Sequence, residues 1–295
     1  MAKFNQGDTD IALPWSRVTQ IHAPRGSQVL IITFNTACFK YVDSKLLERA
    51  QPRSRAHAHP QAQEFTLKTI VVMSQKGGAG KTTLAINLAA AAIKGGFTAV
   101  IADTDPQQSA YNWYKDRDEG LEPDVISSFP DRLAENQDLA RQAGVDYFIV
   151  DTPPNASEFA IRVAKLADLI IVPTKPSCFD LVALERTVTV LETVKKPAFA
   201  VLNECPTYGS EADDAEDALL QYGLTTLPNR IHNRASIRRH TTPLQTIFEY
   251  EPDGKAAVEF SALFKAIALH LLREHQAQRK LKQQEEASHR HAQAH

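Results

Sequence analysis

The sequence predicts an α/β fold in which helices cover both faces of a mostly parallel central β-sheet, giving three layers. From residue 69 onwards, short apolar runs alternate with amphipathic stretches, which is the pattern of repeated βαβ units. Two of the apolar runs end in aspartate, and a third is followed by a glycine-rich loop and a helix-forming run. Ligands of open parallel sheets bind at the carboxyl ends of the strands, so we expect the functional residues there.

The glycine-rich loop, KGGAGKTT, runs from Lys76 to Thr83, between a predicted strand at 69–73 and a predicted helix at 84–94. Its glycines allow successive backbone N–H groups to turn towards one phosphate, and the helix adds the positive end of its dipole. Lys81 supplies a charge for the β- and γ-phosphates, and Thr82 offers a hydroxyl to Mg²⁺. The order strand, loop, helix therefore predicts a phosphate-binding P-loop.

The loop departs from the common GxxxxGK[ST] pattern, because Gln75 replaces the first glycine and Lys76 adds a second lysine. In this double-lysine signature the chain resembles the ParA/MinD family of ATPases. The resemblance implies a P-loop NTPase fold, ATP and Mg²⁺ as cofactors, and an ATP-dependent sandwich homodimer in which Lys76 reaches the partner's ATP. The nucleotide-binding residues that it implies are Gly77, Gly78, Ala79, Gly80, Lys81, Thr82 and Thr83.

The composition fits one large domain with appendages, since the chain has 295 residues, 43% hydrophobic residues and a net charge of −2. Three cysteines without CxxC spacing indicate neither a disulfide framework nor a cysteine-rich metal site, and the expected compartment is the cytoplasm. No apolar run approaches the roughly 20 residues of a membrane-spanning helix, so no stable membrane insertion is expected. Any contact with DNA has to come from a local basic patch.

Residues 1–66 are expected to form an N-terminal extension and linker, with disorder as one interpretation. Within them, 29–34 predicts a strand, 44–50 a short helix, and the Pro-, His- and Gln-rich stretch 51–63 a linker. Two explanations of the extension stay open, a segment of unknown role or translation upstream of the natural start. The ATPase domain is expected at 67–274, and a polar, histidine-rich, disordered tail at 275–295.

Two further motifs follow predicted strands, DTDPQ after 97–102 and DTPP after 147–150. Phosphoryl transfer to water requires a residue that orients the attacking water. The resemblance assigns this catalytic role to Asp105, beside Lys76 and Lys81. It makes Asp151 the Walker B aspartate that holds Mg²⁺ together with Thr82, and it gives Asp103 a supporting role at the metal. A simpler interpretation treats DTDPQ as a turn that only closes a strand.

The predicted strand 199–203 ends in Asn203, whose amide offers a donor and an acceptor for the edge of adenine. In related ATPases an asparagine at this place contacts the base, so Asn203 is a candidate for binding adenine. A loop asparagine satisfied by the protein itself is an equal alternative. Upstream, the predicted strand 168–172 leads into a PSxxD turn, which the resemblance places near the dimer face.

A basic segment without acidic residues follows at 230–240. If it is helical, Arg230, Arg234 and Arg238 fall at i, i+4 and i+8 and form one stripe suited to phosphate-backbone contact. The resemblance makes this segment, with Arg239, the non-specific DNA-binding surface. A solvated basic face is the open alternative. The next helix is predicted at 254–272, with Val258, Ala262, Phe264 and Leu271 in its apolar stripe.

The resemblance implies an ATP-hydrolysing partition protein, cytoplasmic and nucleoid-associated, whose dimer binds DNA and whose hydrolysis is stimulated by a ParB-like centromere-binding protein. A MinD-like membrane-positioning ATPase would need a terminal amphipathic helix with apolar anchors, which 282–295 does not provide. An iron–sulfur carrier ATPase would need a paired CxxC, which the sequence does not contain. An ATP-gated adaptor for a protein cargo stays open.

Overall fold

The computed structural model describes residues 11–13, 16–22, 28–33, 40–43, 67–154, 157–241 and 244–293. It divides into two compact units. One contains Met1–Ala58 with Gln142–Gly144, and the other contains His59–Arg141 and Val145–His295. Each unit contains a β-sheet of its own.

A four-stranded antiparallel sheet lies within the first unit, with the strands in the order β1-β2-β3-β4. Its strands are β1 (Ile11–Leu13), β2 (Ser16–His22), β3 (Gln28–Thr33) and β4 (Lys40–Asp43). Consecutive strands pair, as in hairpins, and β-branched residues such as Val18 and Ile32 stand opposite one another. The strand predicted at 29–34 is confirmed as β3, whereas the helix at 44–50 and the linker at 51–63 lie outside the described residues.

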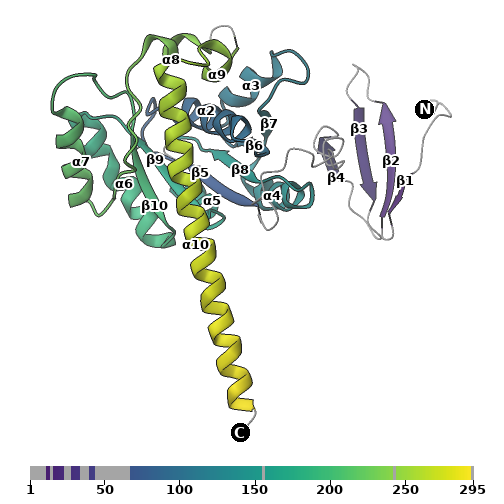
Figure 1. Ribbon diagram of the computed structural model, residues 1–295. Coiled ribbons are helices and arrows are strands. Elements are labelled where there is room, and N and C mark those ends of the chain that lie inside the picture. Colours follow the sequence, from purple (N-terminus) through teal and green to yellow (C-terminus); the bar gives the residue numbers. More distant parts are fainter. Residues whose placement is uncertain are drawn as a thin grey trace. The chain divides into compact units, whose positions relative to one another are not determined.

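The second unit is built on a six-stranded parallel sheet in the order β10-β9-β5-β8-β6-β7 (Figure 1). Every neighbouring pair is parallel, which confirms the predicted P-loop NTPase fold class. The middle strands are buried along their whole length, as expected for a sheet covered on both faces. The strands are β5 (Lys68–Val72), β6 (Ala99–Asp103), β7 (Asp124–Ser127), β8 (Tyr147–Asp151), β9 (Leu169–Thr174) and β10 (Ala198–Leu202).

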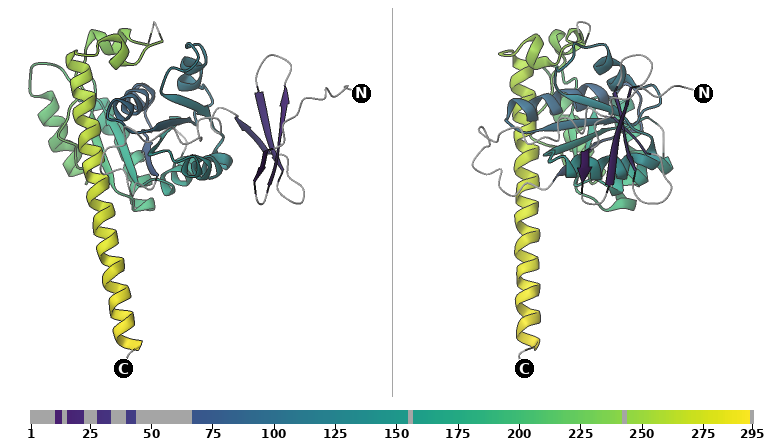
Figure 2. Two further views of the ribbon diagram at one scale, coloured as in Figure 1. Left: turned by 45° about the vertical axis from the view of Figure 1, so that its right-hand side comes forward. Right: turned by 90° about the vertical axis from the view of Figure 1, so that its right-hand side faces the viewer.

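Helices cover both faces of this sheet (Figure 2). Side chains alternate along a strand, and Ile70, Val72 and Ile149 point into the core cluster that α2 and α10 complete. The residues between them face the other side, where α5 and α6 pack against each other. The helices are α2 (Lys81–Lys94), α3 (Ser109–Lys115), α4 (Leu133–Gln142), α5 (Ser157–Lys165), α6 (Cys178–Val194), α7 (Glu211–Gln221), α8 (Ala235–Arg239), α9 (Ile247–Tyr250) and α10 (Lys255–Gln293), with a 3₁₀ turn, η2 (Pro130–Arg132).

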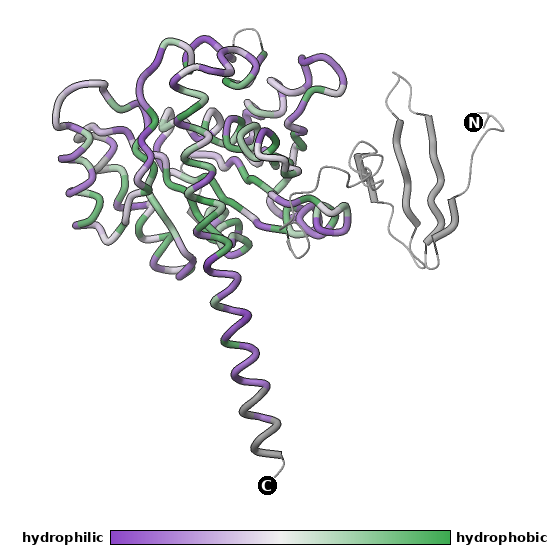
Figure 3. The backbone as a smooth tube through the Cα atoms, viewed as in Figure 1, coloured by the Kyte–Doolittle hydropathy of each residue, from purple (hydrophilic) through white to green (hydrophobic). Residues whose placement is uncertain are grey.

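The last helix, α10, differs from its prediction in length and in its buried face. Phe264 and Leu271 are buried as predicted, but Val258 is 63% exposed, because the core is contacted by the face that carries Phe260, Leu263 and Ile267. The helix also continues to Gln293 through the segment predicted to be a disordered tail. No glycine or proline interrupts it, and its Ala, Gln, Glu, Lys and Arg residues favour helix. The part of its distal half that is coloured in Figure 3 is mostly hydrophilic.

Among the described helices, none combines the length and the apolar character needed to cross a bilayer.

Candidate nucleotide-binding site

The P-loop joins the end of β5 to the start of α2. Gly78 and Gly80 adopt positive φ angles of 75° and 90°, a conformation that costs glycine little. No side chain caps the N-terminus of α2, and its first turn contains no acidic residue. The backbone N–H groups of this turn are therefore available to an external anion, with the helix dipole aligned in the same sense.

Lys81 is placed at the start of α2 with only 7% of its surface exposed. Its Nζ donates a hydrogen bond to the carbonyl of Lys76 at 3.2 Å. Burial lowers the pKa of Lys81, while the nearby Asp151 and Asp105 act in the opposite direction. A cation in this position is ready to pair with phosphate oxygens.

Asp151 and Thr82 meet beside the P-loop, although 69 positions separate them in the sequence. The Thr82 hydroxyl donates to Oδ2 of Asp151 at 2.7 Å. Oδ1 of Asp151 is buried and has no hydrogen-bond partner among the described residues. Burial raises the pKa of Asp151 to about 7. A hydroxyl next to a buried carboxylate with a free oxygen fits Mg²⁺, which prefers hard oxygen ligands.

The DTDPQ segment is folded around Asp103. This carboxylate is almost fully buried and accepts hydrogen bonds from the backbone N–H groups of Asp105 (3.0 Å) and Tyr111 (2.9 Å). Burial raises the pKa of Asp103, and these two hydrogen bonds oppose the shift. Because both oxygens of Asp103 bind the backbone, its visible role is to shape the loop that presents Asp105. Its supporting role at the metal stays a prediction.

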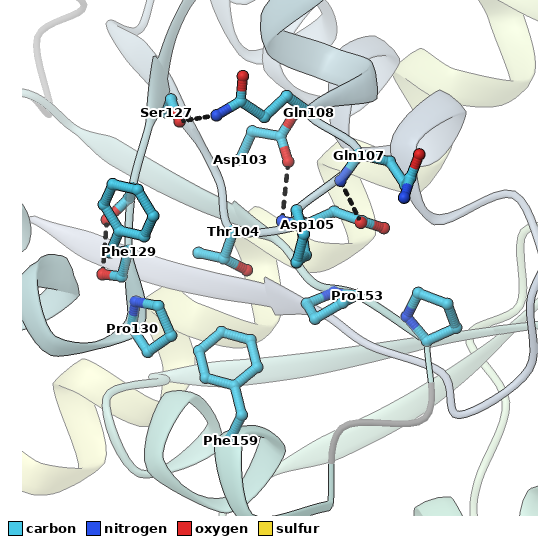
Figure 4. A pocket seen from close by; sticks show the side chains of 13 residues that line it. Asp103, Thr104, Asp105, Gln107, Gln108, Ser127, Phe129, Pro130, Pro153 and Phe159 are labelled. Atoms are coloured by element: carbon cyan, nitrogen blue, oxygen red, sulfur yellow. Dashed lines mark hydrogen bonds between the residues drawn. The ribbon is translucent and has the colours of Figure 1, made fainter.

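Asp105 is half-buried and lines a pocket of about 510 Å³ (Figure 4). Its Oδ1 accepts the backbone N–H of Gln107 at 2.9 Å. Opposite Asp105 lie Phe129 and Phe159, which sequence reasoning did not single out. The available signal was that Phe129 follows a strand, β7, at the carboxyl edge of the sheet, where ligand sites of this fold gather.

Asn203 lies against the P-loop and is 6% exposed. Its Nδ2 donates to the carbonyl of Ala79 at 2.9 Å, and a Cβ at Gly80 would approach this nitrogen to 2.2 Å. The close approach explains why a glycine stands at position 80. The observed contact is the protein-satisfied alternative, and adenine binding by Asn203 stays a prediction.

The predicted arginine stripe at Arg230, Arg234 and Arg238 is wrong in its geometry. The helix α8 begins only at Ala235, because the preceding segment is extended and bonds to β10 and the loop after it, with the N–H of Ile231 donating to Leu202 at 2.9 Å. Arg230 pairs with Asp213 and Glu216, and Arg234 pairs with Glu259. Arg238 and Arg239 remain exposed on α8, with Arg238 also bonded to Asn233. Two of the four predicted arginines are thus paired with carboxylates and two are exposed, and DNA binding by this segment stays a prediction.

Lys76 occupies the start of the loop and forms a salt bridge with Asp180 of α6 at 2.5 Å. This partner was not predicted, because 104 positions separate the two residues. The structure brings the predicted site residues together at one edge of the sheet. They are the P-loop residues and, outside the loop, Asp103, Asp105, Asp151 and Asn203.

The raised pKa of Asp151 leads to a prediction about stability. Between its unfolded value of 3.8 and its folded value of about 7, the folded state holds a proton that the unfolded state has lost. The unfolding free energy should therefore fall as pH rises through this window in the absence of nucleotide and metal. Asp151→Asn removes this titration, and we expect it to be more stable than wild type above pH 7 by about 2–4 kcal/mol.

This expectation is checked by urea unfolding in EDTA at pH 5 and pH 8. The difference between the two proteins isolates Asp151, because all other titrating groups are shared. If the unfolding free energies of wild type and Asp151→Asn change with pH in parallel, burial does not raise the pKa of Asp151.

Three comparisons with known proteins bear on this site. Residues 70–249 match the family model "CobQ/CobB/MinD/ParA nucleotide binding domain". A carboxysome distribution maintenance protein A from Gloeobacter kilaueensis is 30% identical over 210 residues, which are 70% of this chain and 95% of the relative. The chromosome-partitioning ATPase Soj from Thermus thermophilus is 28% identical over 157 residues, 44% of this chain and 63% of the relative.

Solved structures of this family have a similar fold at lower sequence identity. A Cyanothece McdA–ATP complex superposes with a TM-score of 0.57 at 17% identity, covering 70% of this chain and 98% of the other. The septum site-determining protein MinD with Mg-ADP from Pyrococcus horikoshii gives 0.56 at 18% identity, covering 68% and 96%. Similarities at this identity show the fold, and the family model and the relatives carry the family assignment.

Proposed function

Since this chain belongs to the CobQ/CobB/MinD/ParA nucleotide-binding family, we propose that it is an ATPase that partitions or positions a cargo along nucleoid DNA. One observation carries the catalytic part of the proposal: the uncapped N-terminus of α2 lies beside a buried Lys81 and beside the Thr82–Asp151 pair. Anion-binding N–H groups, a fixed cation and a metal-binding carboxylate are the parts that ATP hydrolysis requires.

Each residue has a separate task in this proposal. The N–H groups of residues 80–83 and the ammonium of Lys81 hold the phosphates. Thr82 and Asp151 would hold Mg²⁺, which neutralises charge on the β- and γ-phosphates when it is bound. Asp105, which Asp103 and the N–H of Gln107 hold in place, orients the attacking water.

The ATP-bound protein is proposed to be a homodimer in which Lys76 of each protomer contacts the nucleotide of the other. Lys76 supports this role because its side chain is 34% exposed at the mouth of the loop, whereas Lys81 is buried. The dimer is proposed to bind DNA without sequence preference and to release it after hydrolysis. A ParB-like protein bound to a centromere site is the proposed stimulating partner.

A second candidate cargo is a protein assembly instead of a DNA locus. It is favoured by the relatives from Gloeobacter kilaueensis and Halothiobacillus neapolitanus, both named for maintaining carboxysome distribution and matched over 95% and 91% of their lengths. Plasmid or chromosome loss in a deletion strain would support partition, whereas clustering of a protein assembly with normal DNA inheritance would support the second candidate.

The exposed arginines of α8 lead to a test of DNA binding. Arg238 and Arg239 are exposed, whereas Arg230 and Arg234 are already paired with carboxylates. We expect an Arg238→Ala, Arg239→Ala double variant to weaken DNA binding in ATP for all sequences alike. Each lost phosphate contact should flatten the slope of log K against log salt by about 0.9.

The measurement is filter binding over a salt series, with and without ATP. Arg141→Ala serves as a control, because Arg141 is an exposed arginine paired within α4 and lies outside the α8 surface. Equal salt slopes in the double variant, the control and wild type would show that α8 does not bind DNA. That result would favour an adaptor for a protein cargo.

A further inference from the structure

Lys76, the additional lysine at the start of the P-loop, forms a salt bridge within its own protomer. Its Nζ lies 2.5 Å from Oδ2 of Asp180, close to the start of α6. A second contact joins the same two elements, because the backbone N–H of Gln75 donates to the Thr187 hydroxyl at 3.2 Å. The front of the P-loop is thereby attached to α6 at two points.

Asp180 is the fixed member of the pair and Lys76 the movable one. The side chain of Asp180 is 5% exposed, and that of Lys76 is 34% exposed. Ser177, the N-cap of α6, donates its hydroxyl to Oδ2 of Asp180 and accepts the backbone N–H of Asp180 at 3.3 Å. The carboxylate therefore keeps its place when the flexible lysine side chain moves.

We propose that Asp180 is a positioning residue that holds Lys76 within its own protomer and so sets the ATP and protein concentrations at which the dimer forms. This inference rests on the proposed function, in which Lys76 contacts the partner's nucleotide. Only one contact joins the Lys76 ammonium to Asp180 within the protomer, and in this proposal the side chain leaves Asp180 when it extends to the partner's phosphates. The proposed dimer therefore forms at the expense of the Lys76–Asp180 pair.

The cost of breaking the pair arises mainly at Asp180. A carboxylate that is nearly buried loses its cation when Lys76 leaves, and a buried charge without a partner is unfavourable. Phosphate oxygens of the partner's nucleotide offer Lys76 a stronger anion in exchange. The exchange is thus favourable only with nucleotide present. Asp180 therefore disfavours dimer formation without ATP.

The experiment uses full-length protein with Asp180→Asn, in which the amide keeps the shape and can still accept from Ser177. Sedimentation velocity with a non-hydrolysable ATP analogue measures the dimer dissociation constant, which we expect to be roughly tenfold lower than in wild type. Asp138→Asn is the matched control, because it makes the same charge change in an exposed ion pair of α4. We expect this control to dimerise like wild type.

A second measurement tests the pair without nucleotide. Acylation by acetic anhydride, followed by mass spectrometry, should modify Lys76 several-fold faster in Asp180→Asn than in wild type. The stability of Lys76→Ala gives a further check, because the loss caused by the unpaired Asp180 should be recovered in the Lys76→Ala, Asp180→Asn double variant. A merely structural role of Asp180 predicts no recovery.

Two results would overturn the inference while the proposed function stands. They are unchanged acylation of Lys76, or a wild-type dimer that forms with the analogue and is not strengthened by Asp180→Asn. If wild type forms no nucleotide-dependent dimer at any protein concentration, the proposed function itself fails, and the inference fails with it.

Discussion

Lys81→Ala is expected to reduce ATP affinity by roughly thirtyfold or more, since truncating one partner of a buried charge pair costs about 2 kcal/mol or more. Lys81 is 7% exposed, and its ammonium also offsets the nearby charges of Asp151 and Asp105. The variant therefore loses the cation for the phosphates and leaves two acidic groups facing them. Isothermal titration calorimetry with ATP and Mg²⁺ measures the change.

Lys76→Ala is the informative comparison, because it should leave ATP affinity nearly unchanged and remove ATP-dependent dimerisation. Lys81 bonds to the backbone carbonyl of Lys76, which the substitution keeps, so Lys81 should hold its position. Lys94→Ala is a control for losing a lysine from α2, since Lys94 is exposed in the last turn of that helix. An equal loss of ATP affinity in the Lys76 and Lys81 variants would contradict the division of roles.

The predictions that succeeded concern residues that a strand carries to the sheet edge. Apolar runs placed the strands, and the turn after each run placed Asp103, Asp105 and Asp151, because parallel strands end on the same side. The local sequence pattern was sufficient to place these aspartates, because in a parallel sheet the end of each strand lies at the same edge.

The predictions that failed concern charges whose partners are distant in sequence. By spacing alone Arg230 and Arg234 form an uncompensated basic stripe, but α7 and α10 supply their carboxylate partners, Asp213, Glu216 and Glu259. Periodicity also assumed a helix where backbone groups instead bond to β10. Sequence spacing shows which charges are present, and only the tertiary fold shows which are neutralised.

The α10 errors have a related cause. Val258 fits an apolar stripe by spacing, yet the face that meets the core is set by packing against α2, which the sequence of α10 does not contain. The polar composition of residues 275–295 predicts disorder, whereas the helix continues to Gln293. Helix propensity without glycine or proline is the stronger signal in that segment.

Asp105→Ala is expected to lower the rate of ATP hydrolysis by about 100-fold or more while ATP affinity stays near that of wild type. A positioned acid–base or water-orienting group contributes about 10²- to 10⁴-fold. Asp105 lies at the pocket edge, and its hydrogen bonds with Asp103 and Gln107 stay within the DTDPQ segment, so the phosphate-binding groups should be unaffected. Single-turnover hydrolysis with saturating ATP measures the chemical step.

The effects on DNA and nucleotide binding distinguish a substitution of Asp105 from substitutions of the other carboxylates. If hydrolysis is the step that releases DNA, Asp105→Ala should remain dimeric and DNA-bound in ATP, whereas Asp151→Asn should lose Mg²⁺-dependent nucleotide binding. Asp138→Ala, which removes an exposed carboxylate from α4, should hydrolyse ATP like wild type. Hydrolysis by Asp105→Ala at the wild-type rate would show that the water is oriented by another group. The 510 Å³ pocket that Asp105 shares with Phe129 and Phe159 would then be the place to look for that group.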